Sequence, residues 1–83
     1  MEADEIKRLI EAGLDDAEAR VQGDGSHFDA VVVSPAFEGQ TMVKEQQMVY
    51  ATLGDRITDG TIHALSIRAY TPEEWREQQD RKL

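Results

Sequence analysis

The sequence contains no cysteine, so the protein can form neither a disulfide bond nor a thiolate ligand for a metal. Cysteine nucleophiles and redox-active cysteine pairs are excluded for the same reason. The chain also lacks any apolar run near the ~20 residues that a membrane-spanning helix requires. Its N-terminus is acidic and has no apolar signal region. We therefore expect a cytoplasmic protein whose stability depends on its hydrophobic core alone.

Basic residues are also scarce. Nine lysines and arginines stand against 17 acidic residues, which gives a formal net charge of −8. The longest basic cluster, Arg81-Lys82, lies beside Asp80. Nucleic acids and anionic membranes are bound largely through lysine and arginine, so this balance disfavours both as partners.

Signatures of catalysis are missing as well. Ser26 and His27 are neighbours at a predicted strand start and would point apart, and the chain has no Gly-x-Ser-x-Gly motif. The carboxylate pairs Asp15-Asp16 and Glu73-Glu74 are typical of solvated faces and helix starts. Gly23-Asp24-Gly25 lacks the rest of a phosphate-binding fingerprint. We predict no catalytic residue, no small-molecule substrate and no enzymatic activity.

What the chain does contain is enough for one small globular domain. It has 83 residues, of which 40% are hydrophobic and 31% charged. A chain of this length has room for a single core, so we predict one domain over residues 1–83. A flexible tail is expected from about residue 79.

The N-terminal half predicts a helix followed by a β-hairpin. The helix covers residues 3–12, with Gly13 as its expected C-terminal cap, because the apolar residues form one stripe. Alternating residues predict strands over 18–22 and 27–33. Gly23-Asp24-Gly25-Ser26 between them is a strong turn signal. The helix stripe consists of Ile6, Leu9, Ile10 and Leu14.

The C-terminal half predicts helix, strand and helix. Residues 41–57 favour either one long helix or a short turn followed by a longer helix. A strand is expected over residues 62–69. Thr71, Pro72 and Glu74 predict a capped helix start, and Trp75 is expected to anchor this last helix to the body.

The predicted order is therefore α-β-β-α(-α)-β-α, an α+β fold. The hairpin makes the first two strands antiparallel. The helical connection to the third strand favours a right-handed parallel crossover. The simplest packing is a three-stranded mixed sheet with the helices on one face.

Four segments, taken in order, resemble the BolA family over nearly the whole chain. The short loop before His27 resembles the acid-stress branch of that family. The resemblance implies a type II K-homology-like fold. The segments are Gly25-Ser26-His27-Phe28, Val33-Ser34-Pro35-Ala36-Phe37-Glu38-Gly39, Val49-Tyr50-Ala51-Thr52-Leu53 and Ile62-His63-Ala64-Leu65-Ser66-Ile67-Arg68-Ala69-Tyr70-Thr71-Pro72-Glu73-Glu74-Trp75.

The same resemblance implies a partner and a cofactor. BolA-like proteins form complexes with monothiol glutaredoxins, and some of these complexes share a [2Fe–2S] cluster. The glutaredoxin supplies one cysteine and glutathione another. The BolA-like partner supplies a histidine from the segment matching Ile62-His63-Ala64, and a second ligand from the loop between the first two strands. His63 and His27 are thus the expected ligands, with Asp24 as a competing candidate for the second; no cluster is expected in the isolated protein.

His27 and His63 are the only histidines in the chain. A neutral imidazole can bind iron through one nitrogen while the other is held by a neighbouring group. Each histidine begins a predicted strand, and parallel neighbouring strands begin at the same edge of a sheet. Strict alternation, however, places His63 with Leu65 and Ile67 towards the helices, and His27 with Asp29 on the opposite face.

Two other functions stay open at this point. The first is a DNA-binding transcriptional regulator of BolA type. K-homology domains grip nucleic acid with a Gly-x-x-Gly loop, which this chain lacks, and acids offset Lys44 and Arg56. The second is an interaction module without metal that uses a surface of Trp75, Tyr70 and Met48.

Overall fold

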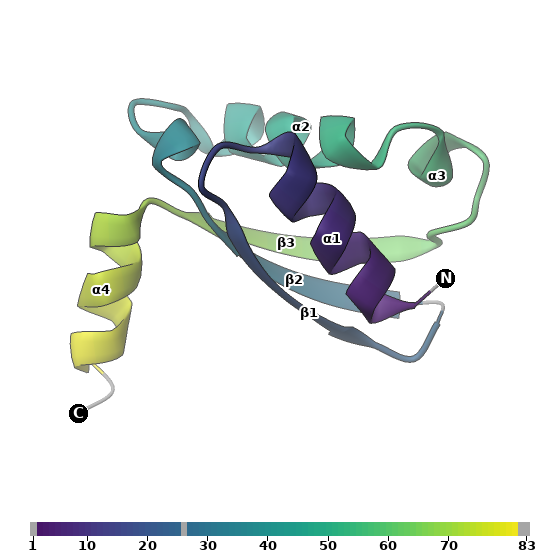
Figure 1. The fold of residues 1–83 in the computed structure, drawn as a ribbon, viewed down its shortest axis with the longest axis horizontal. Coiled ribbons are helices and arrows are strands. Elements are labelled where there is room, and N and C mark those ends of the chain that lie inside the picture. Colours follow the sequence, from purple (N-terminus) through teal and green to yellow (C-terminus); the bar gives the residue numbers. More distant parts are fainter. Residues whose placement is uncertain (1, 26, 82–83) are drawn as a thin grey trace.

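In the computed structural model, which describes residues 2–25 and 27–81, three helices lie on one face of a three-stranded sheet (Figure 1). A fourth helix follows the last strand and lies beyond one end of the sheet. The elements are α1 (Ala3–Gly13), β1 (Glu18–Gly23), β2 (His27–Val33), a 3-10 turn η1 (Pro35–Phe37), α2 (Met42–Leu53), α3 (Asp55–Thr58), β3 (Ala64–Tyr70) and α4 (Pro72–Arg81).

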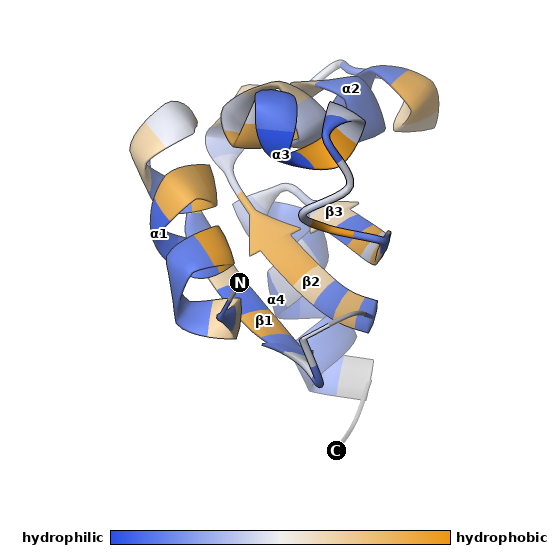
Figure 2. Cartoon of the chain, turned by 90° about the vertical axis from the view of Figure 1, so that its right-hand side faces the viewer, coloured by the Kyte–Doolittle hydropathy of each residue, from blue (hydrophilic) through white to orange (hydrophobic). Residues whose placement is uncertain are grey.

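The sheet has the order β1-β2-β3 and is mixed, as predicted. β1 pairs antiparallel with β2, and β2 pairs parallel with β3. Because β2 is central, its inward residues Phe28, Ala30 and Val32 are almost fully buried against the helices. Figure 2 shows this apolar stretch of β2, in orange, beneath α2 and α3.

The predicted apolar stripe of α1 is confirmed, but the role of Gly13 is different. Ile6 and Ile10 are fully buried in the core. Gly13 is the last residue of the helix, and Leu14 after it is extended at φ −128°. A Cβ on Gly13 would lie 2.6 Å from Cγ2 of Thr52. Glycine is therefore needed where α1 and α2 approach closely, and not as a left-handed cap.

The second helical region is divided differently from both predicted alternatives. A long helix, α2, comes first and a single turn, α3, follows it. Gly54 separates them at φ +56° and ψ −132°, a conformation that disfavours residues with a side chain. Val49 and Leu53 of α2 are fully buried, whereas Met42 and Val43 in its first turn are exposed. Periodicity identified the apolar stripe but not the backbone break.

The capped start of α4 is confirmed. Glu74 N–H donates to Oγ1 of Thr71 at 3.2 Å, and Thr71 N–H donates to Oε1 of Glu74 at 2.8 Å.

The Trp75 ring packs against the Tyr70 ring and against the Arg20 guanidinium, each 5.4 Å away. Arg20 is exposed on the sheet face opposite the helices, so α4 packs there. The prediction that all helices share one face is thus wrong for α4, because its Trp75 packs against the face opposite α1 and α2. In addition, α4 continues to Arg81, past the predicted start of the tail.

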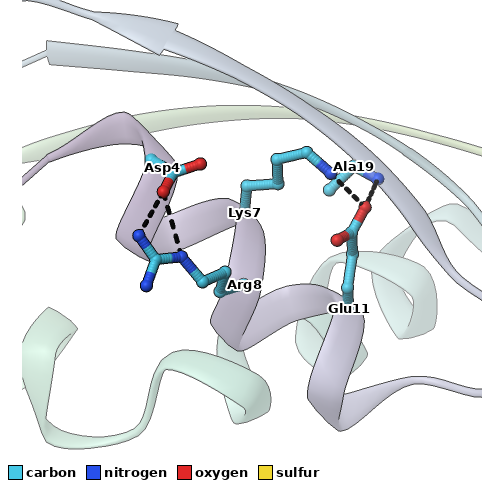
Figure 3. Close-up of polar contacts among 5 residues, drawn as sticks. All are labelled: Asp4, Lys7, Arg8, Glu11 and Ala19. Carbon is cyan, nitrogen blue, oxygen red and sulfur yellow. Dashed lines mark hydrogen bonds and ion pairs between the residues drawn. The ribbon is translucent and has the colours of Figure 1, made fainter.

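Helix side chains cover both edge strands. At the β1 edge, Oε2 of Glu11 accepts a hydrogen bond from Ala19 N–H at 3.0 Å (Figure 3). At the β3 edge, Nε2 of Gln46 donates to the Ile67 carbonyl at 3.0 Å, and the Tyr50 hydroxyl reaches the Leu65 carbonyl at 3.5 Å. Such contacts occupy edge groups that would otherwise pair with another strand.

Within residues 2–25 and 27–81, every helix is too short or too polar to cross a membrane.

Candidate metal site at one edge of the sheet

The parallel register brings the two histidines to the same edge of the sheet. His27, the first residue of β2, is the register partner of Ala64, the first residue of β3. His63 immediately precedes Ala64. Neighbouring strands lie about 4.8 Å apart and consecutive Cα atoms about 3.8 Å apart, so the two histidine Cα atoms are at most about 9 Å apart.

The structure corrects the prediction that alternation turns His63 towards the helices. β3 begins only at Ala64, and His63 lies in a bend before it. The residue of this segment that enters the core is Ile62, which is 3% exposed, whereas His63 is exposed. Because the bend interrupts the alternation of strand residues, His63 is exposed, whereas Leu65 and Ile67 pack against the core. His27 is also exposed.

A compact turn leads into His27. Asp24 Oδ1 accepts a hydrogen bond from His27 N–H at 3.0 Å. Asp24 N–H donates to the His27 carbonyl at 3.3 Å. Gly25 lies at φ +101°, a region that glycine adopts readily. Ser26 lies outside the described residues.

A second local structure leads into His63. Asp59 Oδ1 accepts a hydrogen bond from Thr61 N–H at 2.9 Å. Hydrogen bonding by the Thr61 side chain, and then by its N–H, lowers the pKa of Asp59. Ile62 N–H then donates to the Arg56 carbonyl at 3.0 Å. The chain is therefore held on both sides of the turn, up to the residue before His63.

The two imidazoles do not make a complete site within the part of the chain that the structure describes. There, no group of three or more histidine, cysteine, aspartate or glutamate side chains is arranged to hold a metal ion. Each iron of a [2Fe–2S] cluster takes two ligands from outside the cluster, and imidazole pairs are known at one iron. Two exposed imidazoles at one edge match the type and number of ligands in such a pair.

Ser34 has a structural role and lies at the opposite end of β2 from the histidines. Ser34 is fully buried. Its hydroxyl donates to the Asp15 carbonyl at 2.7 Å and accepts from Ala36 N–H at 3.1 Å. These bonds join the α1–β1 connection to η1.

The three residues considered for a metal-free interaction surface do not form one. Met48 packs against the core on the helix-covered side. Tyr70, the last residue of β3, and Trp75 of α4 pack against each other and are half-buried. These side chains stabilise two different parts of the fold.

The functional detail that sequence reasoning missed is the bond between Asp24 and His27. Asp24 was considered only as a rival metal ligand. The signal was present, because an aspartate followed by glycine in a turn often bonds to a nearby backbone N–H.

Comparison with known proteins identifies the family. A family model described as BolA-like protein matches residues 7–74. The chain belongs to the BolA-like family. This BolA-like chain is 48% identical over 83 residues to the acid stress protein IbaG of Escherichia coli (strain K12), covering 100% of this chain and 96% of that protein. The predicted family and its acid-stress branch are thus confirmed.

The fold is confirmed by a solved relative. The structure of a bolA protein homologue from Coxiella burnetii superposes with a TM-score of 0.83 at 43% identity, covering 92% of this chain and 97% of that one. The BolA-like chain is also 40% identical over 58 residues to the DNA-binding transcriptional regulator BolA of Escherichia coli (strain K12). That match covers 70% of this chain and 54% of the regulator.

Proposed function

We propose that this BolA-like chain is a non-catalytic partner of monothiol glutaredoxins that shares a [2Fe–2S] cluster, in iron–sulfur trafficking or in a response to iron or acid stress. One observation carries the proposal. His27 and His63 are exposed at the same sheet edge, and within the described residues they lack the further ligands that a complete site needs. A site of this kind is suited to assembly between two molecules.

In this proposal His63 and His27 ligate one iron, while a glutaredoxin cysteine and glutathione ligate the other. The shared cluster supplies iron and sulfide that can be passed on, and one-electron redox chemistry. Imidazole ligands raise the reduction potential of such a cluster above that of a cluster held by thiolates alone. Ligation requires neutral histidines, so the shared cluster is expected to be lost in acid.

The similarity to an acid stress protein supports the stress-response part of the proposal. The negative net charge favours a protein partner over nucleic acid or an anionic membrane. A cytoplasmic location, where monothiol glutaredoxin and glutathione are both available, is part of the same proposal.

The test is reconstitution of the mixed complex. The protein is combined anaerobically with a monothiol glutaredoxin, glutathione, ferrous iron and sulfide, and visible absorption and circular dichroism are recorded. We expect a spectrum that differs from the glutaredoxin cluster alone and weakens in His63→Ala and His27→Ala. Gln47→Ala, which removes an exposed side chain on α2, is the matched control. A spectrum of glutaredoxin alone, with no complex by size, contradicts the proposal.

DNA binding is the alternative that the similarity to the BolA regulator favours. The turn between α2 and α3, however, has the single glycine Gly54 followed by Asp55, whose charge repels phosphate. Fluorescence anisotropy with duplex DNA at 50 and 200 mM salt distinguishes the two functions. Affinity that falls steeply with salt supports DNA binding, and no binding at low salt rejects it.

A further inference from the structure

The turn between β1 and β2 holds the backbone of His27 on two sides. Asp24 accepts from its N–H at 3.0 Å and donates to its carbonyl at 3.3 Å. In a standard two-residue hairpin turn, backbone groups make both closing bonds. Here a side-chain carboxylate oxygen accepts the bond from the His27 N–H. The position of His27 thus depends on the identity of residue 24.

Gly23 contributes a second constraint on the same residue. A Cβ on Gly23 would lie 2.3 Å from the His27 carbonyl oxygen and 2.5 Å from Cδ1 of Phe28. Contacts below 3.0 Å require movement, and Phe28 is 3% exposed in the core and cannot move freely. Any larger residue at position 23 would therefore displace the backbone of His27.

We propose that Asp24 is a positioning residue that fixes His27 at the sheet edge beside His63, and that it is not itself the second cluster ligand. This inference rests on the proposed function and decides between the two candidates for that ligand. Oδ1 of Asp24 accepts from the His27 N–H, so this oxygen acts on the backbone, and imidazole suits iron better than a carboxylate does. Fixing the backbone of a ligand before the partner arrives lowers the entropy lost on binding.

The first experiment uses the isolated protein and needs no cluster. Amide hydrogen exchange at His27 is measured by NMR and corrected for intrinsic rates. In Asp24→Ala the exchange is expected to accelerate about fivefold to tenfold, as for loss of one typical hydrogen bond. Asp24→Asn retains an oxygen acceptor and is expected to stay within about twofold of the wild type. Asp80→Ala, which removes one exposed carboxylate on α4, is the control.

Unchanged exchange at His27 in Asp24→Ala overturns the inference. Gly23→Ala provides a second check, since its Cβ would collide with the His27 carbonyl oxygen. It is expected to accelerate the same amide, and retention of the wild-type rate would also count against the proposed constraint.

The second experiment uses the mixture with monothiol glutaredoxin, glutathione, ferrous iron and sulfide. Asp24→Ala is expected to weaken the circular dichroism of the mixed cluster less than His27→Ala does, and Asp24→Asn is expected to restore it. If Asp24→Asn loses the signal while His27→Ala retains it, Asp24 is the ligand and the inference is wrong. A wild-type mixture without a mixed cluster overturns the proposed function instead, so the two failures are distinguishable.

Discussion

The carboxylate of Glu11 in α1 accepts a hydrogen bond from the backbone N–H of Ala19, the second residue of edge strand β1. The same oxygen also pairs with Lys7 one turn earlier in the helix (Figure 3). One side chain therefore attaches α1 to the sheet and covers an edge group of the strand.

Glu11 is expected to stabilise the fold only while it is ionised. The ion pair with Lys7 and the Ala19 N–H both lower the pKa of Glu11 below its ordinary value. A group with a lowered folded pKa contributes stability above its unfolded pKa, and this contribution is lost as the pH falls through the folded value. We expect Glu11→Ala to cost about 1 kcal/mol at pH 7 and markedly less at pH 3. Urea unfolding at both pH values is the measurement, and an equal cost at both would refute the assignment.

Glu45 in α2 should show the opposite pH dependence. Partial burial, and then the negative charge of Glu74, raise the pKa of Glu45. A group with a raised folded pKa contributes stability below its unfolded pKa, and this contribution is lost as the pH rises through the folded value. Glu45→Gln is therefore expected to stabilise the protein by up to about 1 kcal/mol at pH 7 and to be nearly neutral near pH 3.5. Thermal unfolding of both proteins at the two pH values tests this, with Glu38→Gln, an exposed loop residue, as the control.

The close approach of α1 and α2 predicts an intolerance of any side chain at position 13. Gly13→Ala would place its Cβ 2.6 Å from Cγ2 of Thr52 and 2.9 Å from its Cβ. We expect a loss of about 1–3 kcal/mol in the free energy of unfolding, typical of overpacking. Thr52→Ser removes the nearer atom, so the double variant should recover part of the loss. A double-mutant cycle with no coupling would show that the contact is not the cause.

Trp75, the only tryptophan, should report on the docking of α4. Its ring packs against Tyr70 and lies beneath the Arg20 guanidinium. Arg20→Gln removes the cation and is expected to cost about 0.5–1 kcal/mol, with a red shift in tryptophan fluorescence as the ring becomes more exposed. Arg68→Gln, an exposed arginine on β3, is the control. Unchanged fluorescence in Arg20→Gln would show that the arginine does not shield the ring.

Local signals accounted for much of the fold. The capping residues Thr71 and Glu74 bond as predicted, because a capping box depends on residues three apart in the chain. The hairpin forms around the predicted turn, since glycine and aspartate favour turn conformations in any context. The break between α2 and α3 at Gly54 was not predictable in the same way, because a glycine inside an apolar stripe is compatible with an unbroken helix.

The sequence by itself determined the order of the elements, which depends on short-range periodicity and turn residues. The resemblance of four segments indicated the family, and with it the two histidines as candidate ligands. Only the tertiary structure decided which residue of the Ile62-His63 pair is buried and which is exposed. Ile62 enters the core in place of His63 because a bend before β3 interrupts the alternation. The bond between Asp24 and His27, by contrast, joins residues three apart, and the aspartate and glycine of the turn already indicated it. The exposure of His63 depends on packing between neighbouring segments, and no period along the chain specifies it.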